Sequence, residues 1–219
     1  MAYHATILGK CLEAALRGGL LLSNPARRAD VPKPASTATG HAKLRTWSRD
    51  DLRRFLHVAR EDRNYAAWLL LATTALRRGE ALGLPWSALD LDAGTLSVTR
   101  TLVDVDRDRP VWSDSKTARG RRAIRLDPAT IAALRNVRTQ QLEERLLVGA
   151  GYVDYDLVFA WPDGRPLHPE RFSRSCIRLA KRHGLPPLSV HGLRHTWATL
   201  ALTRRVASDA TQGSIRQVV

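Results

Sequence analysis

One stretch near the C-terminus carries the clearest pattern in the chain, and it reads His191-Gly192-Leu193-Arg194-His195-Thr196-Trp197-Ala198-Thr199. The pattern predicts a helix from about residue 191 to residue 202. His191 and Arg194 are three residues apart and therefore share one face of that helix. His191 and His195 have the spacing of two zinc ligands on a helix, but glycine follows His191 where such motifs need glutamate, and no third ligand is evident. A structural pair of histidines is the more common alternative.

Two further blocks lie upstream. The first follows an apolar run at residues 65–76, which we predict to be a buried helix, and reads Leu76-Arg77-Arg78-Gly79-Glu80-Ala81-Leu82-Gly83-Leu84-Pro85-Trp86. Arginines at the end of a buried helix suggest rigidly held guanidinium groups, although a surface pair favoured by the helix dipole is an equal alternative. The second block, which lies between predicted strands at 95–102 and 122–126, is Ser113-Asp114-Ser115-Lys116-Thr117. A lysine at a hairpin tip can donate a proton to a leaving oxygen, but most such lysines are simply solvated.

The composition points to a polyanionic partner. Of the 219 residues, 35 are Lys or Arg and 21 are Asp or Glu, which gives a formal net charge of +14. Such an excess favours nucleic acid as the partner. Arginine, the more abundant cation here, can also grip a phosphate through two parallel hydrogen bonds. The alternative is generic arginine use in a protein encoded by GC-rich DNA.

Several classes of protein are disfavoured. The two cysteines, Cys11 and Cys176, are far apart in sequence and have no metal-ligand spacing. The longest apolar run, residues 66–76, is too short to span a membrane. The N-terminus has no signal pattern of basic and then apolar residues. We therefore expect a reduced, cytoplasmic protein that has neither a metal site nor a membrane segment.

Composition and periodicity divide the chain into four segments. Residues 1–29 contain one amphipathic helix, at about 6–20, and residues 30–45 have the Pro, Ser, Thr, Ala and Gly content of a linker. Residues 46–202 combine several helices with short strands, whereas 203–219 form a divergent tail without a helical stripe. We therefore predict an α+β fold that is mainly helical and has a small antiparallel sheet.

Local signals predict several element boundaries. One helix should start after Ser48 as its N-cap, and another after Asp127, with Pro128 at the first helical position. A short strand is expected at 157–160, and a further helix at 168–183.

Together, these blocks resemble those of the tyrosine recombinases, or phage-type integrases. Residues 76–86 resemble the first arginine box of that family, 115–117 its lysine hairpin and 191–199 its second box, in the family's order and approximate spacing over about 46–202. The resemblance implies the fold of a tyrosine-recombinase catalytic domain, incomplete at its end. Residues 1–29 would be the remnant last helix of a core-binding domain.

The resemblance also assigns roles. Four positions match the family's catalytic residues, namely Arg77, Lys116, His191 and Arg194. The two arginines would clamp the non-bridging oxygens of a scissile DNA phosphate, the lysine would protonate the leaving 5′ oxygen, and the histidine would assist proton transfer. Glu80 and His195 would support them. Further residues expected to contact DNA are Arg78, Lys33, Lys43, Arg119 and Arg121. The implied partners are double-stranded DNA and other protomers of a recombinase assembly, with no metal or other cofactor.

The nucleophile of that family has no counterpart after the second box. In the family, a tyrosine there attacks the phosphate, whereas Tyr3, Tyr65, Tyr152 and Tyr155 all precede the box. We therefore expect a site-specific recombinase or integrase, whose family breaks and rejoins DNA through a phosphotyrosine link, that is inactive alone. One alternative is a non-catalytic DNA-binding or regulatory remnant. Another is a helical protein with an arginine-rich surface, whose four matching side chains would not converge.

Overall fold

A computed structural model describes residues 2–29, 46–114 and 122–215, with the backbone alone described at residues 2, 3, 114 and 204–215. The chain divides into two compact units, Met1–Lys43 and Leu44–Val219. In the smaller unit, helix α1 (Ala2–Arg17) ends before Gly19, whose φ of +72° is a conformation that glycine adopts without strain. A short 3-10 turn, η1 (Pro25–Arg27), follows and is capped by Asn24.

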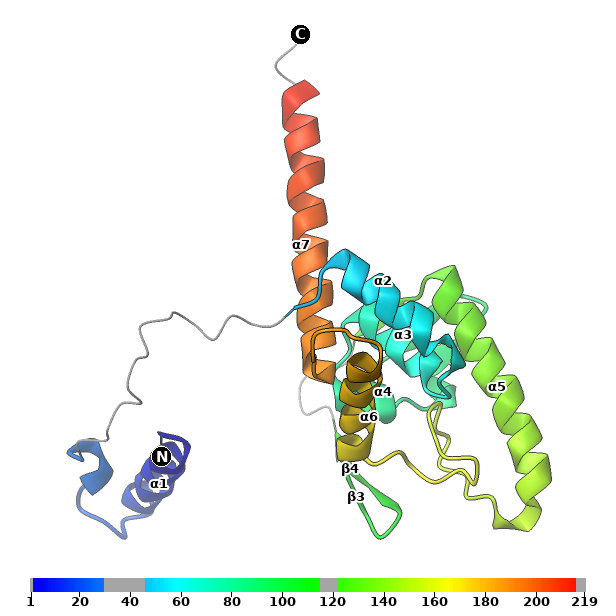
Figure 1. Ribbon diagram of the computed structural model, residues 1–219. Coiled ribbons are helices and arrows are strands. Elements are labelled where there is room, and N and C mark those ends of the chain that lie inside the picture. The colour runs from blue at the N-terminus through cyan, green and yellow to red at the C-terminus, as the bar shows by residue number, and fades with distance from the viewer. Residues whose placement is uncertain (1, 30–45, 115–121, 216–219) are drawn as a thin grey trace. The chain divides into compact units, whose positions relative to one another are not determined.

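The larger unit is mainly helical (Figure 1). Its helices are α2 (Arg49–Val58), α3 (Tyr65–Thr74), α4 (Arg78–Leu82), α5 (Pro128–Val148), α6 (Pro169–Arg182) and α7 (Val190–Ile215), with 3-10 turns η2 (Ala59–Glu61), η3 (Trp86–Ala88) and η4 (Gly149–Gly151). Ser48 and Asp51 form a reciprocal capping box at the start of α2. Asp127 caps α5 through the N–H of Thr130. These two predicted helix starts are confirmed.

The strands form two small antiparallel sheets. One contains β1 (Leu89–Asp90), β2 (Thr95–Ser97) and β5 (Ala123–Arg125) in the order β1-β2-β5, and the other is the hairpin of β3 (Arg100–Asp106) and β4 (Arg109–Asp114). The continuous strand that was predicted at 95–102 is therefore wrong, because the chain leaves the first sheet after Ser97 and enters the hairpin at Arg100.

The strand predicted at 157–160 is also wrong. Leu157 and Ala160 form only isolated bridges, to Pro85 and Pro166 respectively. Both partners are prolines, which have no N–H to donate, so a ladder cannot propagate from either bridge.

The core of the larger unit surrounds α3. That helix is apolar on every side and is buried along nearly its whole length, so other elements must cover it all round. Helices α2, α5 and α7 contact it. The Trp68 ring stacks on that of Phe172 from α6, with centroids 4.1 Å apart, and meets the Phe55 ring of α2 at 6.2 Å.

Helix α7 is longer than predicted. It runs from Val190 to Ile215 and extends beyond the other helices of its unit (Figure 1). The predicted end near Leu202 is wrong because an irregular apolar pattern does not break a helix. Residues 203–212 contain neither proline nor glycine, and several are good helix formers. No helix in the described part of the chain is long and apolar enough to cross a membrane.

Candidate active site

The site begins where α3 meets α4. Ala75 ends α3 in the left-handed conformation, with φ of 53°, a conformation that costs a non-glycine residue about 1 kcal/mol. The buried Leu76 follows and anchors this turn in the core. Arg77 then adopts an extended backbone as the N-cap of α4. The first arginine of the block is thus fixed at its backbone, while its side chain remains 63% exposed.

Helix α4 lies directly on the backbone of β3. A Cβ atom added at Gly79 would be 2.5 Å from the carbonyl oxygen of Leu102, and one added at Gly83 would be 2.7 Å from the nitrogen of the same residue. Real Cβ atoms do not come so close to backbone atoms. The two glycines therefore allow the close packing that fixes Glu80 beside the sheet.

Glu80 provides the carboxylate at the centre of the site. Its side chain is 5% exposed, and each of its oxygens accepts from both Arg77 and Arg122. Oε2 lies 2.8 Å from the Arg77 backbone nitrogen and 2.8 Å from Nη2 of Arg122. Oε1 lies 2.8 Å from Nη1 of Arg77 and 3.3 Å from Nη1 of Arg122. Burial would raise the pKa of Glu80, but these hydrogen bonds outweigh it and lower the pKa to about 2.

Helix α7 brings the second arginine to the same place. Arg194 donates from Nη1 to the carbonyl oxygen of Ala75, the residue that ends α3. The position of the helix is fixed by Thr196, which is fully buried. Its hydroxyl donates to the Gly192 carbonyl oxygen at 2.9 Å and accepts from the Trp47 N–H at 3.0 Å.

The histidines of α7 lie beside the arginines. The rings of His191 and His195 meet edge to face, with centroids 4.4 Å apart. Burial lowers the pKa of His191, and the positive charges of its neighbours, including Arg194 and Arg77, lower it further. At neutral pH the His191 imidazole is therefore uncharged and can accept a proton.

The structure thus brings together Arg77, Glu80, His191, His195 and Arg194. The alternative in which the matching side chains do not converge is not supported by these described residues. The other predicted residues, Lys33, Lys43, Lys116, Arg119 and Arg121, lie outside the described residues. Within the described part, no group of three or more His, Cys, Asp or Glu side chains could hold a metal ion.

Arg78 points to α6. It donates to the Ser173 hydroxyl at 2.7 Å and to the Pro169 carbonyl oxygen at 3.3 Å. It also approaches the Glu170 carboxylate at 3.4 Å. These contacts link α4 to α6, and its predicted contact with DNA stays a prediction.

Arg122 was not among the predicted residues, although it binds Glu80. A signal was present in the alternation of its strand. Arg122, Ile124 and Leu126 are partly or fully buried, while Ala123 and Arg125 are exposed. Because side chains alternate between the faces of a strand, Arg122 had to share the inward face with two apolar residues. An arginine on an inward face needs a buried acceptor.

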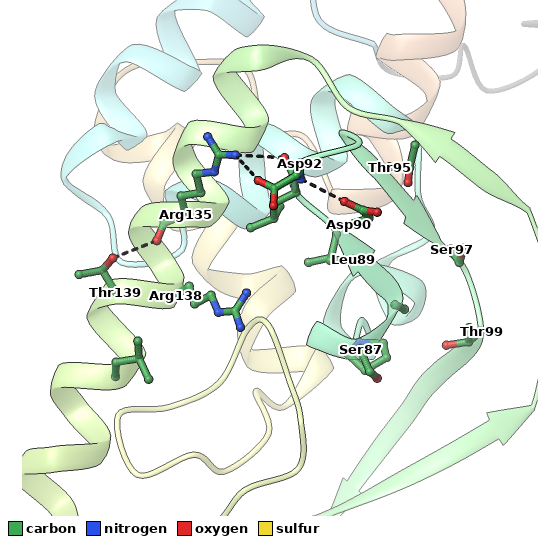
Figure 2. A pocket seen from close by; sticks show the side chains of 14 residues that line it. Ser87, Leu89, Asp90, Asp92, Thr95, Ser97, Thr99, Arg135, Arg138 and Thr139 are labelled. Atoms are coloured by element: carbon green, nitrogen blue, oxygen red, sulfur yellow. Dashed lines mark hydrogen bonds and ion pairs between the residues drawn. The ribbon is translucent and has the colours of Figure 1, made fainter.

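A separate open hollow of about 900 Å³ lies between η3, β1, β2 and α5 (Figure 2). Arg135 pairs there with Asp92 at 2.8 Å, and Arg138 lies over the Trp86 ring at 5.6 Å. None of the residues that line this hollow was predicted as a site residue.

The chain is similar to known proteins over most of its length. The model of the phage integrase family matches residues 45–212. A tyrosine recombinase XerC-like protein of Caldanaerobacter subterraneus subsp. tengcongensis is 27% identical over 200 residues, which cover 86% of this chain and 51% of that protein. The chain thus spans about half the length of the curated relatives it matches.

Two solved structures show the shared fold. One is the Tn1549 transposon integrase in complex with a circular intermediate DNA, with a TM-score of 0.74 and 18% identity over 93% of this chain and 66% of that one. The other is a lambda integrase dimer bound to a COC′ core site, with a TM-score of 0.57 and 20% identity over 90% of this chain and 64% of that one. From the family match and this fold, the chain belongs to the phage integrase family.

Proposed function

We propose that this chain binds double-stranded DNA and forms the phosphate-binding part of a site-specific recombinase. The observation that carries the proposal is the convergence of three guanidinium groups, those of Arg77, Arg122 and Arg194, and an uncharged imidazole around one carboxylate. One carboxylate cannot balance the charges of Arg77, Arg122 and Arg194, so the positive charge of the site is not fully neutralised. Such a site favours an anion with several oxygens, and a DNA phosphate diester is one.

In the reaction of a recombinase, each group would have a separate task. Arg77 and Arg194 would donate to the non-bridging oxygens and stabilise the charge that develops in the transition state. His191 would accept or return a proton, and Glu80 would orient Arg77. Lys116 is proposed from the family resemblance alone to protonate the leaving 5′ oxygen.

The attacking tyrosine is proposed to come from outside these 219 residues, because all four tyrosines precede the second box. Another protomer of a recombinase assembly would be one source. We accordingly propose that the chain cannot cleave DNA alone. A non-catalytic DNA-binding or regulatory role is the second candidate, and the same observation favours it.

The segment assignments are part of the proposal. Residues 1–29 would be the remnant last helix of a core-binding domain, 30–45 a linker, 46–202 an incomplete catalytic domain and 203–219 a divergent tail. A DNA-recombining protein would work in the cytoplasm, where the free thiols of Cys11 and Cys176 would remain reduced.

DNA binding by the purified chain tests the proposal. Fluorescence anisotropy with a labelled duplex should show binding, and replacing both Arg77 and Arg194 with alanine should weaken it about tenfold or more. The control is Arg135→Ala, which removes an arginine of the hollow that pairs with Asp92. Equal losses in the two variants would contradict a phosphate site at Arg77 and Arg194.

A denaturing gel separates the two candidate functions. With a nicked duplex that traps covalent intermediates, we expect no protein–DNA adduct from the chain alone. An adduct that requires an added, tyrosine-containing relative would support a recombinase subunit. An adduct formed by the chain alone would contradict the proposed external nucleophile.

A further inference from the structure

Arg122 holds two parts of the larger unit together. Its backbone carbonyl oxygen accepts from the Val98 N–H at 3.0 Å, which extends the pairing of β2 with β5. Its side chain, 32% exposed, reaches the Glu80 carboxylate on α4. The residue is therefore fixed at both its backbone and its guanidinium group.

The contacts of Glu80 show what Arg122 contributes. Both terminal nitrogens of Arg122 face the carboxylate, in the two-pronged geometry that arginine forms with acids. Arg77 contributes its backbone N–H and Nη1. Without Arg122, two acceptor sites on a buried carboxylate would be empty, and among the described residues Arg77 already contacts that carboxylate and could fill them.

We propose that Arg122 is a positioning residue of the phosphate site: by occupying Glu80, it keeps the guanidinium group of Arg77 from closing onto that carboxylate and so available to a phosphate. The inference rests on the proposed function. Among the described residues, Arg77 contacts the carboxylate side chain through Nη1, and its side chain remains 63% exposed. That exposure leaves the other edge of the guanidinium group accessible to a ligand.

Two other roles for Arg122 make different predictions. A direct phosphate contact would need a free guanidinium edge, whereas both terminal nitrogens are directed at Glu80. A purely structural link between β5 and α4 would affect unfolding but would leave the affinity of the folded protein for DNA unchanged. The three roles therefore differ in how the effect of removing Arg122 on DNA affinity depends on whether Glu80 is present.

A double-mutant cycle on DNA affinity distinguishes them. The variants are Arg122→Gln, Glu80→Gln and the two combined, with Arg125→Gln as the control because Arg125 is an exposed arginine only three residues away. We expect Arg122→Gln to weaken binding about tenfold, and to add less than about twofold when Glu80 is already Gln, because the two residues act as a unit. Arg125→Gln should not show this coupling. Losses that multiply, or no loss from Arg122→Gln in a folded protein, would overturn the inference.

A second measurement does not depend on DNA. If Arg77 closes onto Glu80 in Arg122→Gln, the Glu80 carboxyl group keeps its hydrogen bonds, so its ¹³C NMR titration in the free protein should stay at low pH, whereas it should move to higher pH when Arg122→Gln is combined with Arg77→Ala. A titration that moves as far in Arg122→Gln alone as in the double variant would overturn the inference. If Arg122→Gln does not fold, Arg122→Lys serves instead. It should weaken DNA binding less than Arg122→Gln, because the ammonium group keeps the positive charge but lacks the two-pronged geometry.

The proposed function and this inference fail in different ways. If the wild-type chain does not bind DNA, or if binding is unaffected by Arg77→Ala, the proposed function is wrong. If the wild-type chain binds through Arg77 but the Arg122 and Glu80 losses multiply, this inference alone is wrong.

Discussion

At the scale of single residues, Glu80 links acid stability to the site. Its pKa falls from 4.5 to about 2 in the folded protein. A depressed carboxyl pKa stabilises the fold above about pH 4.5 and loses that effect as the pH falls towards 2. The shift corresponds to something on the order of 3 kcal/mol.

We therefore predict that Glu80→Gln destabilises the protein at pH 7 but hardly at low pH. The difference in the free energy of unfolding between wild type and variant should shrink by about 2 kcal/mol between pH 5 and pH 2.5. Urea denaturation at several pH values measures it, with the exposed Glu143→Gln as the control. A difference that stays constant with pH would show that the fold does not depress the pKa of Glu80.

Substitutions at Thr196 measure how much one buried hydroxyl group contributes to the stability of the fold. Valine has nearly the same shape but would leave the Trp47 N–H without its acceptor, which should cost about 1–3 kcal/mol. Serine keeps the hydroxyl and should cost less. Thermal unfolding of Thr196→Val and Thr196→Ser measures both, and a larger loss in the serine variant would mean that the methyl group matters more than the hydrogen bond.

At the scale of elements, side-chain caps made the starts of α2 and α5 predictable. The Ser48 and Asp127 caps are set by side chains within three residues of the helix, so the sequence alone could reveal them. The end of α7 depends on the residues that follow Leu202, and the isolated bridges of Leu157 and Ala160 depend on the segments that lie opposite them. The local hydrophobic pattern records neither. The same limit applies to the site. Its two sequence blocks, residues 76–86 and 191–199, could be recognised locally, but the contact between Arg122 and Glu80 joins residues 42 positions apart.

The contact between α4 and β3 gives a prediction for a whole element. In Gly79→Ala, the new methyl group would overlap the Leu102 carbonyl oxygen, so α4 must move away from β3. We expect a loss of about 1–3 kcal/mol in stability, and weaker DNA binding because Arg77 and Glu80 move with the helix. The control is Gly9→Ala on α1, where the added methyl group has no neighbour within 4 Å. Normal stability and binding in Gly79→Ala would mean that the packing of α4 on β3 is not needed.

At the scale of the whole molecule, general charge and the specific site must be separated. A formal charge of +14 draws DNA to many surfaces at once, so affinity alone does not locate the phosphate contacts. The salt dependence of binding in variants can locate these contacts, because each phosphate that a protein neutralises adds about 0.9 to the magnitude of the slope of log K against log salt.

We predict that replacing Arg77 and Arg194 with alanine lowers the magnitude of that slope by about 1, because both arginines are proposed to contact the same phosphate, whereas Arg135→Ala leaves it unchanged. The physical reason is local: Arg77 is exposed beside the occupied Glu80, while Arg135 is already paired with Asp92. Anisotropy titrations between about 50 and 200 mM salt would measure the slopes. If the double variant kept the wild-type slope, the affinity would come from the arginine-rich surface as a whole, and the convergence of Arg77 and Arg194 would serve the fold instead of a DNA phosphate.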